Sequence, residues 1–214
     1  MAFKWNSNSY CLMTLTLMVT LGIMLQLTPT EACSCYPEHA QTAYCEADYV
    51  IVAQILRKSK VKSNGNNVYK INIKKEYKMN PRAQKLLKQG KLITPASDSM
   101  CGLQLEINQL YAIAAQDIHV GLCSFVRKYH EMTIVEKRGL AGIYRKGCPC
   151  KIKPCFSSNC NVTLGSCNWT PWESCESMYG SCIPARGTLL DGSPAKCHWR
   201  RSPMYQKCKN GTLE

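Results

Sequence analysis

The sequence is short of acidic residues and of the motifs that catalysis requires. Its 214 residues contain 14 Asp and Glu against 27 Lys and Arg, which gives a formal net charge of +13 at pH 7. The segment at His130 and Glu131 begins like a zinc-protease motif, but Ile134 stands where the second histidine ligand is needed. A nucleophile elbow and a phosphate-binding loop are also absent. An enzyme is therefore not expected, and the four histidines are interpreted as surface or packing residues.

Long hydrophobic runs are absent after residue 32, so no membrane span is expected in the body of the chain. The one long apolar run, residues 11–27, follows Lys4 and ends shortly before the small residue Ala32. A positive start, an apolar core and a small residue at the cleavage position are typical of a secretory signal peptide. Residues 1–32 are therefore predicted to be a leader that is removed, so that the secreted chain begins at Cys33. A membrane anchor is the alternative, because the run falls only just short of a span.

Cysteine is abundant, with 15 residues in the chain, and removal of the leader takes away only Cys11. The even number that remains indicates a disulfide framework in an oxidising compartment. Structural zinc is the alternative for the closely spaced cysteines of GCPCKIKPCFSSNC, residues 147–160. Secretion argues against that alternative, because oxidised cysteines offer no thiolate to a metal.

The composition changes near residues 148–150. In the first part, Tyr69, Ile71 and Ile73 alternate with polar residues, which is the period of a half-buried strand. Strands are predicted at residues 49–59, 68–78, 109–116 and 123–136, with a hairpin turn at residues 63–67. Several short strands of this kind predict an all-β barrel or sandwich. The second part holds eight cysteines among Gly, Pro and Ser, so it is expected to depend on its disulfides.

Helices are expected in fewer places. Pro37 suits the first turn of a helix within residues 36–47. Asn80 is predicted to cap a second helix that Gly90 stops. Residues 134–147 remain ambiguous between helix and strand by periodicity alone.

Several segments together point to a known family. They are CSCYPEHAQTAYCEADYVIVAQI from Cys33, ASDSMCG around Cys101, YAIAAQD, EKRGLAGIY and GCPCKIKPC. These segments resemble the tissue inhibitors of metalloproteinases over essentially the whole chain after the leader. A Cys-x-Cys that becomes the mature N-terminus, with the other cysteines in this order, is the most specific part of the resemblance.

The resemblance implies a mainly β fold with a few helices. Residues 33–148 would form an OB-like, five-stranded netrin-type barrel that inhibits proteases, and residues 149–214 a small cysteine-rich subdomain. It also resolves residues 134–147 toward helix. The function implied is that of a secreted inhibitor of zinc metalloendopeptidases, namely matrix metalloproteinases and disintegrin-type sheddases, with no cofactor of its own.

The resemblance also implies a disulfide pattern. In the first part it pairs Cys33 with Cys101, Cys35 with Cys123, and Cys45 with Cys148. In the second part it pairs Cys150 with Cys197, Cys155 with Cys160, and Cys167 with Cys182. The two cysteines that remain, Cys175 and Cys208, are expected to pair, which is one bond beyond the usual vertebrate arrangement. Spacing alone does not select these connections.

By the same resemblance, the mature N-terminus makes the inhibitory contact. The α-amine and carbonyl of Cys33 would chelate the catalytic zinc of the protease and displace its water. Ser34 would point at the primary specificity pocket. The protease-binding residues implied are Cys33, Ser34, Cys35, Tyr36, Pro37, Ser97, Asp98, Ser99, Met100 and Cys101. Two simpler alternatives remain. The disulfides would only stabilise the fold, or residues 97–100 would form an ordinary loop without a binding role.

A matrix-binding or receptor-binding module is the competing hypothesis, and it depends on charge. Sulfated glycosaminoglycans or acidic matrix would suit the cationic cluster Arg57, Lys58, Lys60, Lys62, Lys70, Lys74, Lys75 and Lys78. Nucleic acid is not an expected partner, because the compartment is wrong and no binding motif is found. Three Asn-x-Thr sequons, at Asn161, Asn168 and Asn210, are candidate glycosylation sites in the second part.

Overall fold

The computed structural model describes residues 13–19, 33–60, 65–157, 160–161, 163–185, 192 and 196–212. The chain divides into two compact units, Met1–Ala32 and Cys33–Glu214. In the first unit, residues 13–19 are helical and exposed. No helix within the described ranges has both the length and the apolar character needed to cross a membrane. All elements named below belong to the second unit.

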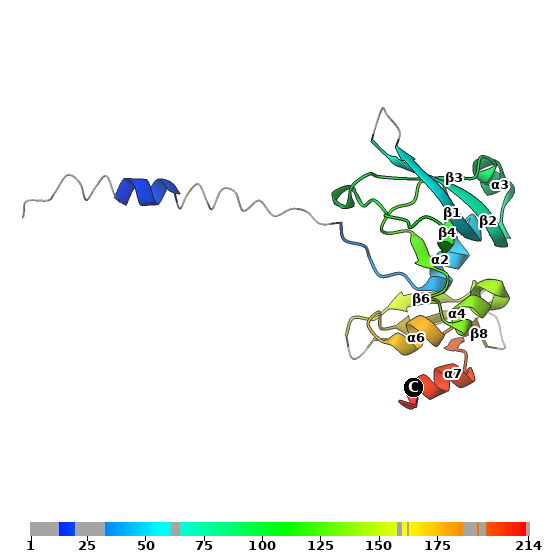
Figure 1. The fold of residues 1–214 in the computed structure, drawn as a ribbon. Helices are drawn as coiled ribbons and strands as arrows, with labels where there is room; N and C mark the ends of the chain where they lie inside the picture. The colour runs from blue at the N-terminus through cyan, green and yellow to red at the C-terminus, as the bar shows by residue number, and fades with distance from the viewer. Residues whose placement is uncertain are drawn as a thin grey trace, which may run out of the picture. The chain divides into compact units, whose positions relative to one another are not determined.

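Five antiparallel strands form the main sheet, in the order β3-β2-β1-β4-β5 (Figure 1). The strands are β1 (Tyr49–Lys60), β2 (Asn67–Met79), β3 (Lys91–Thr94), β4 (Leu110–Ala115) and β5 (Phe125–Lys128). β1 and β2 form the predicted hairpin, with Lys60 opposite Asn67; residues 61–64 of its turn lie outside the described residues. The prediction of one strand over residues 123–136 was too long, because the chain turns after β5 and Thr133 begins a helix.

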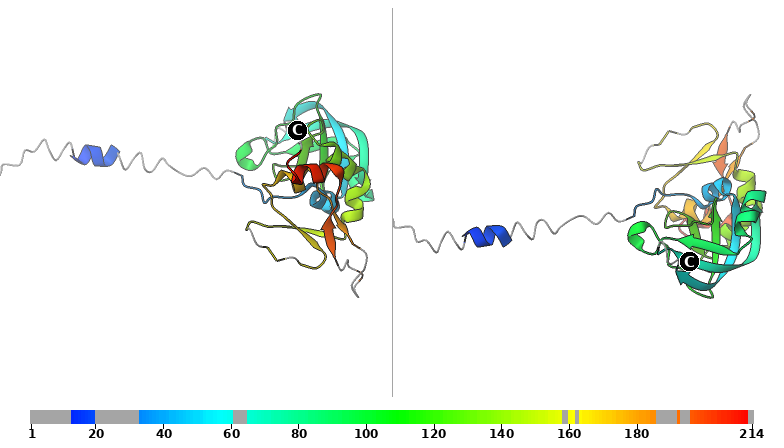
Figure 2. Two further views of the ribbon diagram at one scale, coloured as in Figure 1. Left: turned by 90° about the horizontal axis from the view of Figure 1, so that it is seen from below. Right: turned by 90° about the horizontal axis from the view of Figure 1, so that it is seen from above.

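The sheet curls instead of lying flat (Figure 2). The pairing of β1 with β2 shifts register at three places between Val50 and Arg57, and such bulges bend a strand and increase its twist. The edge strand β3 is also joined, at Ile93, to the chain segment before β5 that contains His119. The N–H of Ile93 donates to the carbonyl of Ile118 at 2.9 Å, and the N–H of Val120 donates to that of Ile93 at 2.8 Å. The predicted five-stranded barrel is confirmed as a half-barrel with this single parallel bridge.

The first half of the central strand β1 is buried on both faces, because its alternate side chains enter two cores. Tyr49, Ile51 and Ile55 fill the interior of the half-barrel with the other strands. Val50 packs on the opposite face with the helix α2 (Ala40–Glu46) and the helical segment that contains Tyr144. Because side chains alternate along a strand, one set of β1 residues fills the half-barrel and the other set packs against the helices outside it.

Two helices carry clear sequence signals, and one prediction about them was wrong. In α3 (Pro81–Leu87), Asn80 caps the helix by accepting the N–H of Ala83 at 2.7 Å, as predicted. Gly90 follows with φ +57°, a left-handed conformation that glycine adopts without steric cost. Pro37, however, does not lie in the first turn of α2. The cap of α2 is His39, whose side chain accepts the N–H of Gln41, and Pro37 belongs to the extended segment before it.

Residues 134–147 are helical, as the family resemblance implies. They form α4 (Ile134–Arg138), the turn η2 (Gly139–Ile143) and α5 (Tyr144–Gly147), with a kink at Gly142, where φ is +150°. A Cβ atom on Gly139 would lie 2.3 Å from the ring of Tyr144, so only glycine fits there. This close approach lets the Tyr144 ring bury itself completely under α4.

The second part of the unit is built on disulfides. It contains the parallel pair β6 (Lys151–Pro154) and β7 (Ser166–Trp169), the antiparallel pair β8 (Cys182–Pro184) and β9 (Cys197–Trp199), and the helices α6 (Ser174–Tyr179) and α7 (Pro203–Lys209). Its buried cluster consists of Cys150, Cys167, Cys182 and Cys197. The seven disulfides of the structure join the fourteen cysteines in the expected pairs, Cys175 with Cys208 included.

Glu136 joins α4 to the edge strand β5, and its side chain is fully buried. One carboxylate oxygen accepts the N–H of Thr133 at 2.8 Å, and the other pairs with the guanidinium of Arg127. The Thr133 hydroxyl oxygen in turn accepts the N–H of Glu136, which completes a capping box.

Replacing Glu136 by Ala should therefore lower the free energy of unfolding by about 1–3 kcal/mol, the usual cost of losing hydrogen bonds to a charged group, because Arg127 is partly exposed and can be rehydrated. Chemical denaturation with the disulfides intact measures this change. Glu106→Ala is the matched control, because its pairing with Lys128 is solvent-exposed and should leave stability close to wild type. Equal losses in the two variants would contradict the buried role of Glu136.

Candidate functional site

Cys33 and Cys35 are fastened to two different parts of the half-barrel. Cys33 is bonded to Cys101 with a Cα separation of 5.4 Å, and Cys35 to Cys123 with 5.2 Å. Residues 33–39 form neither helix nor strand, and exposure alternates from Cys33 to Tyr36. The two cysteines are accordingly half-buried, whereas Ser34 between them is exposed. We call residues 33–35 the anchored segment.

The two anchor points are also joined to each other. The N–H of Leu122 donates to the carbonyl of Cys101 at 2.8 Å. Gly121 permits this approach, because a Cβ atom at that position would lie 2.9 Å from the same carbonyl oxygen. Sequence reasoning missed Gly121 and Leu122. The glycine two residues before Cys123 was the signal that could have found them.

Residues 97–101 form a compact turn beside the anchored segment. Asp98–Met100 is a single 3₁₀ turn, and Cys101 ends it with φ +59°. The N–H groups of Met100 and Gly102 both donate to the carbonyl of Ser97, and the Ser97 and Ser99 hydroxyls lie 3.0 Å apart. The Met100 side chain is 54% exposed. The structure therefore brings this predicted loop next to Cys33 through one disulfide and leaves its tip facing solvent.

Tyr36 and Pro37 continue beyond the anchored segment and are exposed. The Tyr36 ring meets the ring of Phe156 edge-on, with centroids 5.8 Å apart. Phe156 lies in the second part of the unit, so the predicted site residues contact both parts. Sequence reasoning missed this contact because it joins positions 120 residues apart in sequence.

Gln41, at the start of α2, ties the half-barrel to the second part of the unit. Its amide nitrogen donates to the carbonyls of Gly147 at 3.1 Å and of Cys182 at 2.8 Å, and its oxygen accepts the N–H of Cys182 at 2.9 Å. A Cβ atom on Gly147 would lie 2.4 Å from the Gln41 amide nitrogen. In Figure 1, α2 accordingly lies between the sheet and strand β6.

His39 lies beside Gln41 and is only 2% exposed. One ring nitrogen, Nδ1, accepts the N–H of Gln41, so Nε2 carries the proton and donates to the carbonyl of Glu176 at 3.0 Å. Edge-on contacts with Trp169 at 5.4 Å and with Tyr144 at 6.3 Å enclose the ring. Burial lowers the pKa of His39 to about 4, because the charged form loses its hydration. His39 is thus a packing residue, as the sequence suggested.

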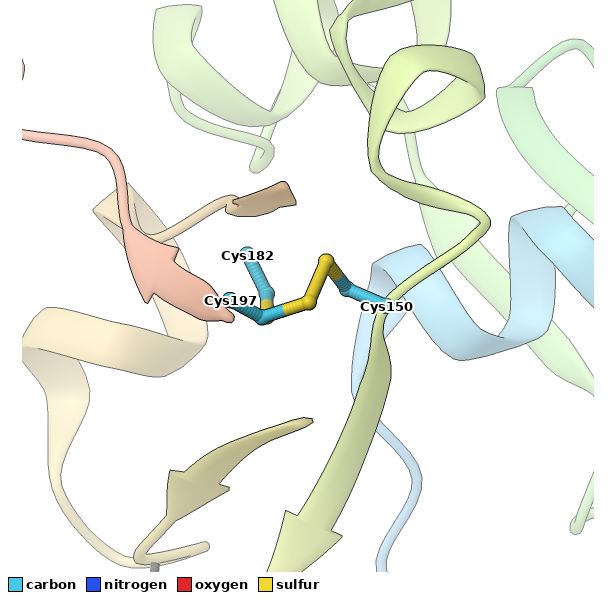
Figure 3. A group of neighbouring side chains, drawn as sticks. All are labelled: Cys150, Cys182 and Cys197. Carbon is cyan, nitrogen blue, oxygen red and sulfur yellow. A yellow bond between two sulfur atoms is a disulfide. The ribbon is translucent and has the colours of Figure 1, made fainter. Parts of the chain in front are cut away.

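Three cysteine sulfurs meet in the second part of the unit, and distance alone would let them hold a metal (Figure 3). Cys150 is bonded to Cys197, and the neighbouring Cys182 is bonded to Cys167. Disulfide sulfurs carry no thiolate, which is the form that binds zinc. The group therefore acts as the buried centre of a small core and not as a ligand set.

The three sequons differ in their surroundings. Asn161 and Asn210 are exposed. Asn168 is half-buried, and its side-chain nitrogen donates to the carbonyls of Cys160 at 3.0 Å and of Asn161 at 3.3 Å. A glycan on that nitrogen would have to replace these bonds, so Asn161 and Asn210 are the better candidate sites.

Fold and site together define a disulfide-framed scaffold in which residues 33–35 are fastened to the half-barrel by two disulfides. The family model described as "Tissue inhibitor of metalloproteinase" matches residues 31–199. The chain is 36% identical over 197 residues to the "Tissue inhibitor of metalloproteinase" of Drosophila melanogaster, covering 91% of this chain and 94% of that protein. It is also 32% identical over 215 residues to the human "Metalloproteinase inhibitor 2", covering 90% of this chain and 93% of that protein.

A third relative is the "Metalloproteinase inhibitor 3" of Scyliorhinus torazame, 33% identical over 172 residues, with 78% of this chain and 80% of that protein covered. The chain therefore belongs to the tissue inhibitor of metalloproteinase family. This confirms the resemblance found in the sequence. Proteins of this family are protease inhibitors, so the expectation that the chain is not an enzyme is confirmed as well.

The buried, neutral His39 makes stability depend on pH. Above pH 6.5, the ordinary pKa of histidine, His39 is neutral in both the folded and the unfolded chain, and the free energy of unfolding has its full value. As the pH falls from there toward about 4, the unfolded chain takes up a proton that the folded chain does not. The free energy of unfolding should then fall by about 3 kcal/mol, since each pH unit is worth about 1.4 kcal/mol.

His39→Asn tests this prediction, because asparagine can still cap α2 but does not titrate. Denaturant unfolding between pH 7.5 and 4.5 should give a flatter pH dependence for the variant than for wild type. Parallel curves for the two proteins would show that another group causes the loss of stability.

Proposed function

We propose that this protein is secreted and inhibits zinc metalloendopeptidases with its anchored segment. The observation that carries the proposal is the pair of disulfides that hold Cys33 and Cys35. Because the Cys33 sulfur is bonded to Cys101, only the backbone nitrogen and carbonyl of this residue remain to bind a metal. Matrix metalloproteinases and disintegrin-type sheddases are the proposed targets, and the zinc belongs to the protease.

Cleavage after Ala32 is the first step of the proposed mechanism. In the full chain, the nitrogen of Cys33 is a peptide amide, which is a poor metal ligand. Removal of residues 1–32 turns it into an α-amine with an ordinary pKa of about 7.7–8. Loss of a proton to reach the ligand form is then easy near neutral pH, and metal binding drives it further.

The amine and carbonyl of one residue can close a five-membered chelate ring on a metal. A catalytic zinc keeps one position open for water or substrate, and this ring would take that position. Chelation by a chain end needs no charged side chain. It does need a chain end that stays in place, and the bonds of Cys33 and Cys35 supply that constraint, because a free terminus normally frays. Preorganisation of this kind lowers the ordering cost of binding.

The exposed side of the anchored segment would face the protease. Ser34 is the side chain proposed for the primary specificity pocket, where a small hydroxyl favours breadth of targets over selectivity. Tyr36 and Pro37 would follow along the cleft. The turn of residues 97–100, which one disulfide holds beside Cys33, would occupy the unprimed side. In this proposal residues 33–148 are the inhibitory domain, and residues 149–214 are a subdomain that carries the sequons.

One additional Ala before Cys33 should abolish most inhibition, because it converts the α-amine back into an amide. The extended protein and the protein that begins at Cys33 should unfold at the same denaturant concentration. Titration of each against the catalytic domain of a matrix metalloproteinase gives the comparison, with one-to-one inhibition expected for the cleaved form alone. Full inhibition by the extended form would defeat the chelation mechanism.

Retention by sulfated glycosaminoglycans is a second role, and the charge on β1 and β2 supports it. Arg57 and Lys74 are exposed there, and Lys70 lies opposite Arg57 in the strand register. Clustered cations attract polyanions, and added salt weakens the attraction. Lys62 of the predicted cluster lies outside the described residues.

The double variant Arg57→Gln/Lys74→Gln should elute from immobilised heparin at a lower NaCl concentration than wild type. Lys146→Gln/Lys151→Gln is the matched control, because it removes two exposed charges elsewhere and should elute closer to wild type. Protease inhibition should be unchanged in both variants. The same shift in both would mean that overall charge, and not this strand pair, governs retention.

A further inference from the structure

Three exposed aromatic side chains lie in contact beside the anchored segment. Tyr36 follows Cys35 directly, Phe156 lies in the loop that one disulfide closes, and Trp172 precedes α6. The rings of Tyr36 and Phe156 have centroids 5.8 Å apart, as do those of Phe156 and Trp172. We call these three residues the aromatic row.

The aromatic row is exposed although the fold offers burial close by. The exposed fractions of Tyr36, Phe156 and Trp172 are 71%, 51% and 66%. Trp169, three residues before Trp172, is instead buried, with its ring N–H bonded to the Ser177 hydroxyl. Contiguous exposed aromatic surface is typical of protein contact sites, and Trp and Tyr dominate binding energy there.

Tyr36 also lines a groove of about 390 Å³. Its apolar walls include Pro37, Ile152, Pro154 and Trp169. An adjoining cavity of about 320 Å³ lies toward the loop before β5. Apolar walls next to an exposed aromatic side chain suit an apolar side chain of a partner.

The charge of the groove is opposite to that of the chain. Glu38 and Glu46 line both cavities, Asp117 lines the second, and the described lining residues include no Lys or Arg. The whole chain, in contrast, carries +13. Among the described residues, neither Glu38 nor Glu46 forms an ion pair. Burial, and then the nearby Glu46, raise the pKa of Glu38, so a cation placed between them would be favoured.

We propose that the aromatic row and this groove form a second contact surface for the protease that the anchored segment inhibits. The occupant is a surface loop of the protease catalytic domain that carries a Lys or Arg next to an apolar side chain. Continuity argues for this partner, because Tyr36 is two residues from Ser34 and a protein seated on Ser34 must lie against it. The inference rests on the proposed function and adds residues of the second part of the unit to the inhibitory surface.

The two components of the surface have different kinetic effects. Apolar contacts with Phe156 and Trp172 slow dissociation, because they form only in the docked complex. The carboxylates of Glu38 and Glu46 attract a cationic loop from a distance, which raises the association rate and makes it depend on salt. Rates of binding therefore separate the two components.

The experiment uses the secreted protein that begins at Cys33 and the isolated catalytic domain of a matrix metalloproteinase. Phe156→Ala/Trp172→Ala should dissociate roughly tenfold to a hundredfold faster than wild type, with one-to-one inhibition retained at saturation. Ile134→Ala is the matched control, because Ile134 is a 53% exposed apolar residue on α4 outside the aromatic row. Its dissociation rate should equal that of wild type.

Glu46→Gln tests the groove separately. It should lower the association rate and reduce its dependence on salt, while the dissociation rate changes little. If the double aromatic variant does not fold, as judged by near-UV circular dichroism, the single variant Trp172→Ala replaces it, since that side chain is 66% exposed.

The outcomes distinguish this inference from the function on which it rests. A wild-type protein that does not inhibit overturns the proposed function. A wild-type protein that inhibits, with a folded aromatic variant that dissociates at the wild-type rate, overturns the second surface alone. Faster dissociation in Ile134→Ala as well would assign the effect to general apolar loss and also overturn it.

Discussion

The disulfide bonds of Cys33 and Cys35 are the constraint on which the proposed site depends. They close loops with sequence separations of 68 and 88, each worth on the order of 4 kcal/mol in the chain-entropy model. Their larger consequence is local, because these two disulfides are the bonds that hold the anchored segment, residues 33–35, against the half-barrel. The bond between Leu122 and Cys101 then ties the two anchor points together, so the segment and its supports behave as one frame.

The same segment leads directly into the contact between the two parts of the unit. Within four residues of Cys35, the chain reaches His39, and then Gln41, and each of these side chains bonds to a group more than 100 residues away in sequence. The second part has a core built mainly of disulfides and needs such contacts for support. Hydrogen bonds from the start of α2 therefore join the cysteine-rich part to the half-barrel, directly after the anchored segment.

Two predictions were wrong, and both used local sequence patterns in segments whose conformation depends on specific contacts. Pro37 is compatible with a first helical turn, but α2 begins only after His39, whose side chain caps it by accepting the N–H of Gln41. Residues 129–136 have strand-forming composition, yet Thr133 and Glu136 form a capping box, and Glu136 pairs with Arg127. In both cases a specific bond outweighed a weak propensity.

Sequence alone indicated four of the five strands of the half-barrel, with β3 missed and β5 drawn too long, together with the Asn80 cap and the character of the cysteine-rich part, because alternation, capping and cysteine spacing are local signals. With the family resemblance it also indicated the disulfide partners and the anchored segment. Only the tertiary structure brought Phe156 and Trp172 beside Tyr36 and placed Glu38 and Glu46 around an apolar groove. The contact of Tyr36 with Phe156 joins positions 120 residues apart, and no periodicity or motif encodes which distant side chains will meet.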